Sequence, residues 1–105
     1  FDSARKTEYQ ITLATKSLLE TERLAKDKKE EAAVSSAKNA KSHLEKALSK
    51  ANSSKDLSSV KAEAQNKLAN IQTFLPNLKM ETSDSVDSIL DELAKKVSEL
   101  QSKLQ

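Results

Sequence analysis

The absence of glycine is the feature that most constrains how this chain folds. The 105 residues include no Gly and a single Pro, Pro76. Glycine most readily adopts the left-handed backbone angles of tight turns and two-residue β-hairpins, so a sheet built from short hairpins is disfavoured. The chain is instead rich in Ala, Leu, Lys, Glu and Gln, which favour helices. Because aromatic residues make up only 3% of the chain, the sequence predicts an all-α fold with a thin aliphatic core.

A helix is predicted over residues 55–75. Its apolar residues recur at spacings of three and four, so they share one helical face; they are Leu57, Val60, Ala64, Leu68, Ile71 and Leu75. With Ser53 as the N-cap, the carboxylate of Asp56 falls near the positive end of the helix. Pro76 lacks an N–H and pushes Leu75 away from helical angles, so we expect it to end the helix.

The last predicted helix, residues 84–104, has the most regular pattern of the chain. Its apolar residues are spaced alternately by four and three, which is the heptad seam of a coiled coil; they are Val86, Leu90, Leu93, Val97, Leu100 and Leu104. Ser83 or Asp84 can cap its start, and Asp87 adds early negative charge. The seam could pack inside a bundle or join two copies of the chain.

The first half of the chain predicts helical segments 3–27 and 31–52, with Asp2 or Ser3 as the first cap. The stripe of segment 31–52 is rich in Ala, so a partner helix could approach it closely. Six consecutive charged residues, Lys26 to Glu31, separate the two segments. They include no Gly, Pro, Asn or Ser, which are common turn residues. A continuous long helix and a turn between two antiparallel helices both remain open.

Together these segments predict a single helical domain over residues 1–105. Segments 31–52, 55–75 and 84–104 are expected to form an antiparallel three-helix bundle with coiled-coil-like packing. The first helix is then either long or folded back to give a fourth.

The junction from Ala51 to Lys61 resembles a known bacterial module. A small residue, a hydroxyl pair (Ser53 and Ser54) and the step from Leu57 to Val60 lead into a helix. This is similar to the second-to-third helix junction of FIVAR-type and GA-type three-helix modules in Gram-positive surface proteins. The resemblance implies a module of a bacterial surface or secreted protein, hence an extracellular or cell-surface location. It implies no particular ligand-binding residue in this chain.

Few residues could support catalysis or hold a cofactor. His43 is the only histidine and there is no Cys, whereas a metal site needs several ligands. Loops that cradle phosphate or frame a nucleophile depend on glycine. We therefore expect a protein that is not an enzyme and that has no cofactor or metal. The net charge of +2 gives no strong footprint for nucleic acid, and no apolar run approaches the roughly 20 residues of a membrane span.

These observations favour a non-catalytic helical protein-binding module, an adhesin-like unit that engages a host serum or matrix protein through a helix face. The candidate contact residues are Tyr9, Lys38, Lys41, Lys46 and Lys50. The alternative is a structural spacer or a coiled-coil oligomerisation unit that uses the 86–104 seam. An exchangeable lipid-binding helix bundle is a third hypothesis, disfavoured by the scarcity of aromatic residues. The acidic start of the last helix could face these lysines, or both surfaces could stay solvated.

Overall fold

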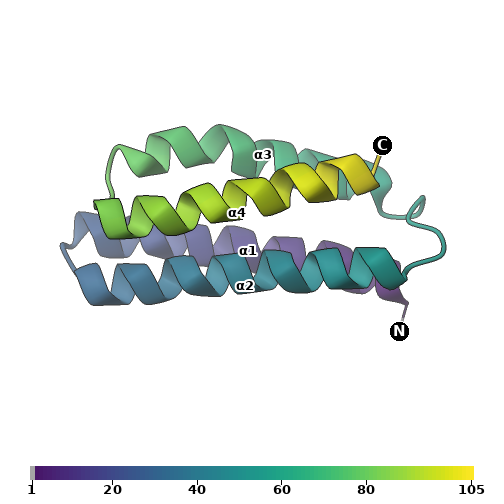
Figure 1. The fold of residues 1–105 in the computed structure, drawn as a ribbon, viewed down its shortest axis with the longest axis horizontal. Coiled ribbons are helices and arrows are strands. Elements are labelled where there is room, and N and C mark those ends of the chain that lie inside the picture. The colour runs from purple at the N-terminus through teal and green to yellow at the C-terminus, as the bar shows by residue number, and fades with distance from the viewer. Residues whose placement is uncertain (1) are drawn as a thin grey trace.

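The computed structural model describes residues 2–105, and this part of the chain contains four α-helices and no strand. The helices are α1 (Ser3–Lys26), α2 (Glu30–Ser53), α3 (Lys61–Lys79) and α4 (Asp84–Lys103). They lie side by side in a bundle of 42 × 23 × 17 Å (Figure 1). The all-helical prediction is confirmed. The bundle has four helices rather than three, because the first segment folds back, as one of the two alternatives proposed.

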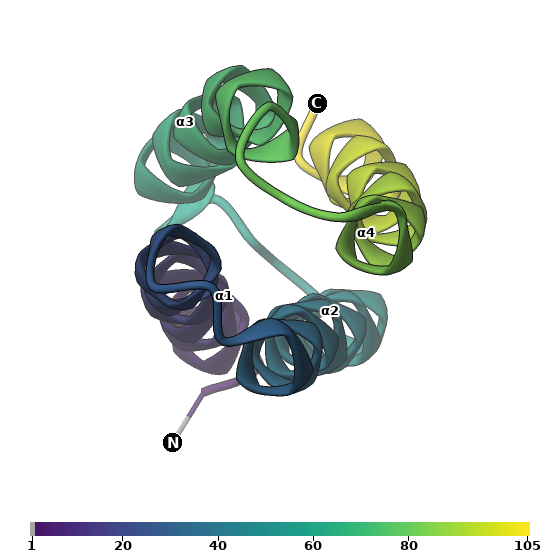
Figure 2. The same ribbon diagram turned by 90° about the vertical axis from the view of Figure 1, so that its left-hand side faces the viewer.

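The four helices occupy the corners of a square when the bundle is viewed end-on (Figure 2). α1 and α4 each contact both α2 and α3, whereas the described residues show no contact across either diagonal. The chain direction alternates from helix to helix (Figure 1). Consecutive helices are therefore antiparallel neighbours within the hairpins α1–α2 and α3–α4. The expectation that α2 and α3 would also be neighbours is wrong. Residues 54–60 cross the end of the bundle and place these two helices at opposite corners.

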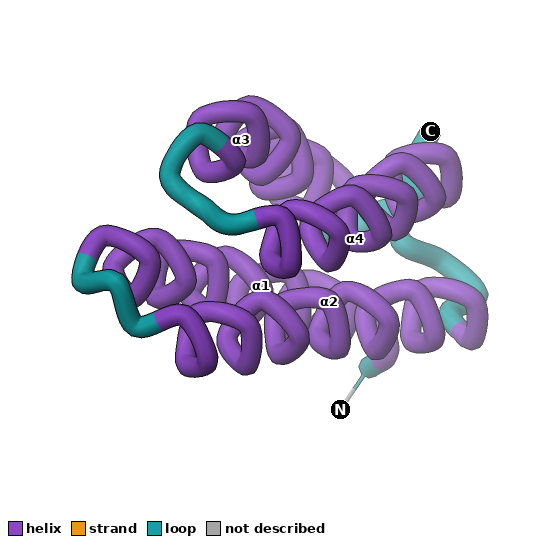
Figure 3. The backbone as a smooth tube through the Cα atoms, turned by 60° about the vertical axis from the view of Figure 1, so that its left-hand side comes forward, coloured by secondary structure: helices purple, strands orange, loops and turns teal. Residues whose placement is uncertain are grey.

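A tight turn at residues 27–29 joins α1 to α2 (Figure 3). Lys28 adopts a left-handed conformation with φ 60°. The N–H of Lys28 donates to the carbonyl of Ala25 at 3.0 Å, and that of Lys29 donates to Leu24 at 2.9 Å. This pair of hydrogen bonds is the Schellman motif, in which the left-handed residue is usually glycine. A left-handed lysine costs roughly 1–2 kcal/mol, and the turn offsets that cost by allowing α2 to pack on α1.

The contact between α1 and α2 is built from small side chains, as the Ala-rich stripe predicted. Ala33, Ala37 and Ala40 are fully buried, so the two backbones approach closely. Buried polar groups within it are satisfied locally: the Ser17 carbonyl accepts from the hydroxyls of Ser36 and Thr21, both at 2.8 Å. The rest of the core is aliphatic; it includes Ile11, Leu18, Leu44, Leu68, Ile71, Leu78, Leu90, Leu93 and Leu100.

The start predicted for the third helix is wrong. Ser53 is the last residue of α2, where its hydroxyl donates back to the Lys50 carbonyl at 3.1 Å, and α3 begins at Lys61. Residues 55–60, predicted to be the start of this helix, instead belong to the segment that crosses the bundle. Asp56 caps a short turn there, since its Oδ1 accepts from the Ser58 N–H at 2.9 Å. Local capping chemistry suits a loop of this kind as well as a helix start.

The predicted stop at Pro76 is also wrong. Pro76 lies inside α3, which continues to Lys79. Proline has no N–H to donate to the Gln72 carbonyl. Because Pro76 is exposed, water can solvate that carbonyl instead. Continuing the helix buries Leu78 completely, which is worth about 1.5–3 kcal/mol and offsets much of the roughly 3 kcal/mol that an interior proline costs. Met80, directly after α3, is 85% exposed.

The prediction for α4 holds. Ser83 is the N-cap, and its hydroxyl accepts from the Val86 N–H at 3.4 Å. Every residue of the heptad seam is buried against the other helices of the same chain. An oligomer through this seam would therefore require the bundle to open.

Candidate interaction surface

Two hydrogen bonds set the register of α1 against α2. His43 Nδ1 lies 2.8 Å from Gln10 Oε1, and Ser36 Oγ donates to the Ser17 carbonyl at 2.8 Å. Both pairs fit the same antiparallel register. Moving one residue forward along α1 corresponds to moving one residue backward along α2. Residues near the start of α1 therefore lie level with the end of α2.

This register places three of the predicted contact residues at neighbouring levels along the bundle axis. Lys46 lies level with residue 7, so it is about 3 Å along the bundle axis from Tyr9 at a rise of 1.5 Å per residue. Lys50 is one turn further and points about 40° from Lys46. Tyr9 is 57% exposed, Lys46 is exposed and Lys50 is half-buried. We call Tyr9, Lys46 and Lys50 the Tyr9 surface; it lies on the outer side of α1 and α2.

The other two predicted residues lie elsewhere. Lys41 is nine residues from Lys50, which places it on the opposite side of α2 at about 100° per residue. There its Nζ contacts Glu92 Oε2 of α4 at 2.6 Å. This hydrogen bond raises the pKa of Lys41 and lowers that of Glu92. Lys38 is exposed and lies about 12 Å along the axis from Lys46, so the four lysines do not form a single face.

Among the described residues, one ion pair joins the acidic start of α4 to α2. Glu92 pairs with Lys41, whereas Asp91 pairs with Lys79 of α3. Lys38, Lys46 and Lys50 of α2 therefore make no ion pair with α4 in the described part of the chain.

His43 serves the α1–α2 contact. Its ring is half-buried, and burial, followed by the nearby charge of Lys46, holds its pKa below the ordinary value. The described residues hold no group of three or more His, Cys, Asp and Glu side chains placed to bind a metal ion.

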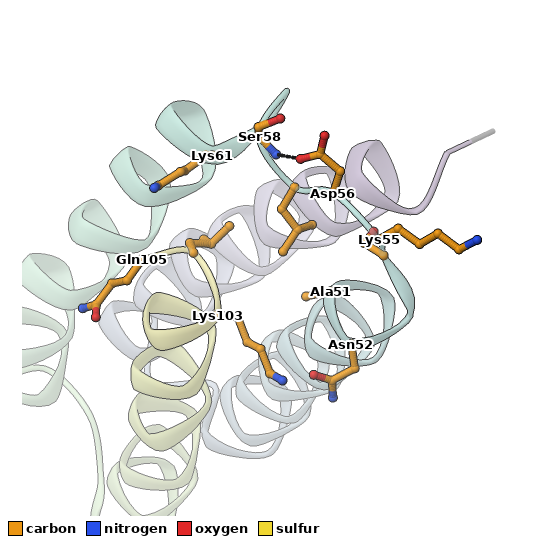
Figure 4. A pocket seen from close by; sticks show the side chains of 11 residues that line it. Ala51, Asn52, Lys55, Asp56, Ser58, Lys61, Lys103 and Gln105 are labelled. Atoms are coloured by element: carbon orange, nitrogen blue, oxygen red, sulfur yellow. Dashed lines mark hydrogen bonds between the residues drawn. The ribbon is translucent and has the colours of Figure 1, made fainter.

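A polar pocket of about 430 Å³ lies at the end of the bundle where residues 54–60 cross (Figure 4). Lysines from three segments line it, but they diverge: Lys55 extends away from Lys61 and Lys103. The Asp56 carboxylate is engaged by Ser58, which lowers its pKa. The buried Ser54 hydroxyl has no partner in the described chain. These groups do not converge on one point, so the pocket does not assemble a reactive centre.

Sequence reasoning missed a groove between α1 and α3. A cavity of about 200 Å³ is lined by Leu18, Leu19, Ile71 and Phe74, and by Thr15 and Asn70. Thr15 and Asn70 also line an adjoining cavity of about 260 Å³. Leu19 is 53% exposed. Its place beside the apolar stripe of α1 was the available signal, but only the position of α3 turns that leucine into part of a groove.

Comparison of the chain with protein-family models, curated proteins and solved structures found no match in any of the three. No helix within residues 2–105 combines the length and apolar character needed to cross a membrane.

Proposed function

We propose that this chain is a non-catalytic protein-binding module of a bacterial surface or secreted protein, and that it engages an acidic patch on a host serum or matrix protein. The observation that carries the proposal is the Tyr9 surface. An exposed tyrosine offers a large amphipathic contact at low entropic cost, and such residues are enriched among binding hot spots.

The charges around Tyr9 support an acidic partner. Lys46 and Lys50 lie at neighbouring levels along the bundle axis, and neither makes an ion pair with another described residue. Complementary charge steers a partner to the surface and fixes its orientation. The hydrogen bonds of Gln10 and Ser36 hold the two helices in register, so the contact residues are preorganised.

The proposed location rests on the resemblance of residues 51–61 to FIVAR-type and GA-type modules. A bundle that presents side chains on rigid helices suits an extracellular module of this kind. The alternative role as a spacer or oligomerisation unit is less favoured, because the 86–104 seam is already buried within one chain.

A capture experiment tests the proposal. The folded domain is immobilised, plasma and matrix extract are passed over it, and retained proteins are identified by mass spectrometry. We expect one enriched protein, which is lost when Tyr9→Ala is combined with Lys46→Glu. Lys38→Glu is the matched control, since it makes the same charge change on an exposed α2 position away from Tyr9, and it should retain the protein. An empty column, or equal capture by the double variant, would refute the Tyr9 surface and favour the spacer role.

A further inference from the structure

The exposed face of α3 is unusual for this chain because it carries no charge along most of its length. Between residues 66 and 77 the exposed residues are Asn66, Ala69, Asn70, Gln72, Thr73, Pro76 and Asn77. The one charged residue in this stretch, Lys67, is half-buried and bonds to Glu8 and Thr12 of α1. Charged residues make up 32% of the sequence, and their depletion marks the centres of protein–protein interfaces.

The uncharged face borders the groove between α1 and α3. The groove runs from Thr12 to Leu19 on α1 and from Lys67 to Phe74 on α3, seven residues on each helix. This corresponds to about 10.5 Å, the distance between residues i and i+7 of a third helix laid along it. Docked amphipathic helices use anchors at this spacing. Leu19, half-exposed at one end of the groove, would be covered by such a helix.

The charges around the groove define the occupant further. On the α1 side, Lys16 lines the groove and is exposed, and its side chain makes no ion pair or hydrogen bond with another described residue. Lys67 is already neutralised by Glu8, and the α3 side is uncharged. The groove therefore has one unbalanced positive charge on one wall, which favours a carboxylate at the matching edge of the docked helix.

We propose that the α1–α3 groove binds a single amphipathic helix of another protein, which inserts an apolar ridge against Leu19 and Phe74 and directs an acidic side chain toward Lys16. The groove lining shares no residue with the Tyr9 surface, although Tyr9 and Lys16 are seven residues apart and so lie on nearly the same side of α1.

The test titrates isotope-labelled protein with a synthetic helical peptide that has a leucine ridge and glutamates along one edge. A second peptide carries lysines in place of the glutamates. Amide chemical shifts locate the site and give the affinity. We expect shifts at Leu19, Asn70 and Phe74, and weaker binding of the lysine peptide.

Two groove variants and one control variant make the test specific. Leu19→Lys should weaken binding of the glutamate peptide by about tenfold or more, the usual effect of losing an interface anchor. Met80→Lys is the control, because it charges an even more exposed apolar side chain outside the groove and should leave binding unchanged. Lys16→Gln should remove the preference between the two peptides.

Several results would overturn the proposal: no binding at millimolar peptide, equal binding of both peptides to the unaltered protein, or shifts confined to other surfaces. Shifts at the groove that grow with protein concentration without peptide would also overturn it, because the occupant would then be a second copy of the chain.

Discussion

Replacing Pro76 by alanine should make the protein markedly more stable. Pro76 lies inside α3 with its ring exposed, so alanine adds an N–H that can donate to the Gln72 carbonyl and removes a clash without disturbing the core. An interior proline costs about 3 kcal/mol relative to alanine. Proline also restricts the unfolded chain, which returns roughly 0.4–1 kcal/mol to the natural sequence. The expected gain in the free energy of unfolding is therefore about 2 kcal/mol.

Thermal unfolding followed by far-UV circular dichroism measures this gain. At about 4–8 °C per kcal/mol for a domain of this size, the midpoint should rise by roughly 8–16 °C. Thr73→Ala is the control, since it changes an exposed α3 residue whose propensity differs from alanine by no more than about 0.7 kcal/mol. An unchanged or lower midpoint for Pro76→Ala would mean that the helix ends at Leu75, as the sequence pattern alone suggested.

Three substitutions and one change of pH test the packing and the titration of the bundle. Ala37→Leu should destabilise the protein by about 1–3 kcal/mol in urea unfolding, because the added side chain overpacks the close α1–α2 contact. Ser36→Ala should cost about 1 kcal/mol, since the Ser17 carbonyl keeps a second hydroxyl donor. Ser83→Ala should cost about 1 kcal/mol through loss of the α4 cap. The lowered pKa of His43 means that its contribution is fully present above the ordinary pKa of about 6.5 and is lost as the pH falls through the folded value, which urea midpoints at neutral and mildly acidic pH will measure.

Matched variants separate these effects from general disturbance. Ala32→Leu makes the same change as Ala37→Leu at an exposed α2 position and should be nearly neutral. Similar costs at both sites would contradict the close α1–α2 packing. His43→Gln should flatten the stability profile just below pH 6.5. If the stability of His43→Gln kept the full dependence on pH, groups other than His43 would be responsible for that dependence. An N-cap role for Ser83 would be rejected if Ser83→Ala left the unfolding midpoint unchanged.

The helices themselves were largely predictable, because periodicity and composition are properties of the local chain. The stripe of α4 and the cap at Ser83 follow from spacing and side-chain chemistry, and both occur where expected. The turn at Lys28 was not predictable, since its left-handed residue is a lysine and no Gly, Pro, Asn or Ser marks it. Pro76 was wrongly predicted to end the third helix, because it is a strong local signal for a helix end. A local breaker was tolerated because continuing the helix buries Leu78.

The candidate surfaces divide in the same way. Tyr9 could be recognised as a surface aromatic because it falls off the apolar stripe of its own helix. The lysines at its level could not be identified, since only the antiparallel register of α1 and α2 places Lys46 and Lys50 near the level of Tyr9 along the bundle axis. Lys41 was grouped with them by sequence, yet it points toward α4 and pairs with Glu92. A run of lysines within one helix therefore does not identify a face unless their angular positions are also considered.

By itself, the sequence determined that this chain forms amphipathic helices with an aliphatic core, because apolar spacing and the absence of glycine act within single segments. Only the tertiary structure decided that four helices share the core, that α2 and α3 stand at opposite corners, and that Leu19 and Phe74 border one groove. The physical reason is that each helix buries one apolar face. Several arrangements of the helices would bury these faces equally well, so the sequence of a single helix does not choose among them. The choice among them depends on contacts between residues far apart in the chain, such as the bond from Ser36 to Ser17 and the ion pair of Lys41 with Glu92.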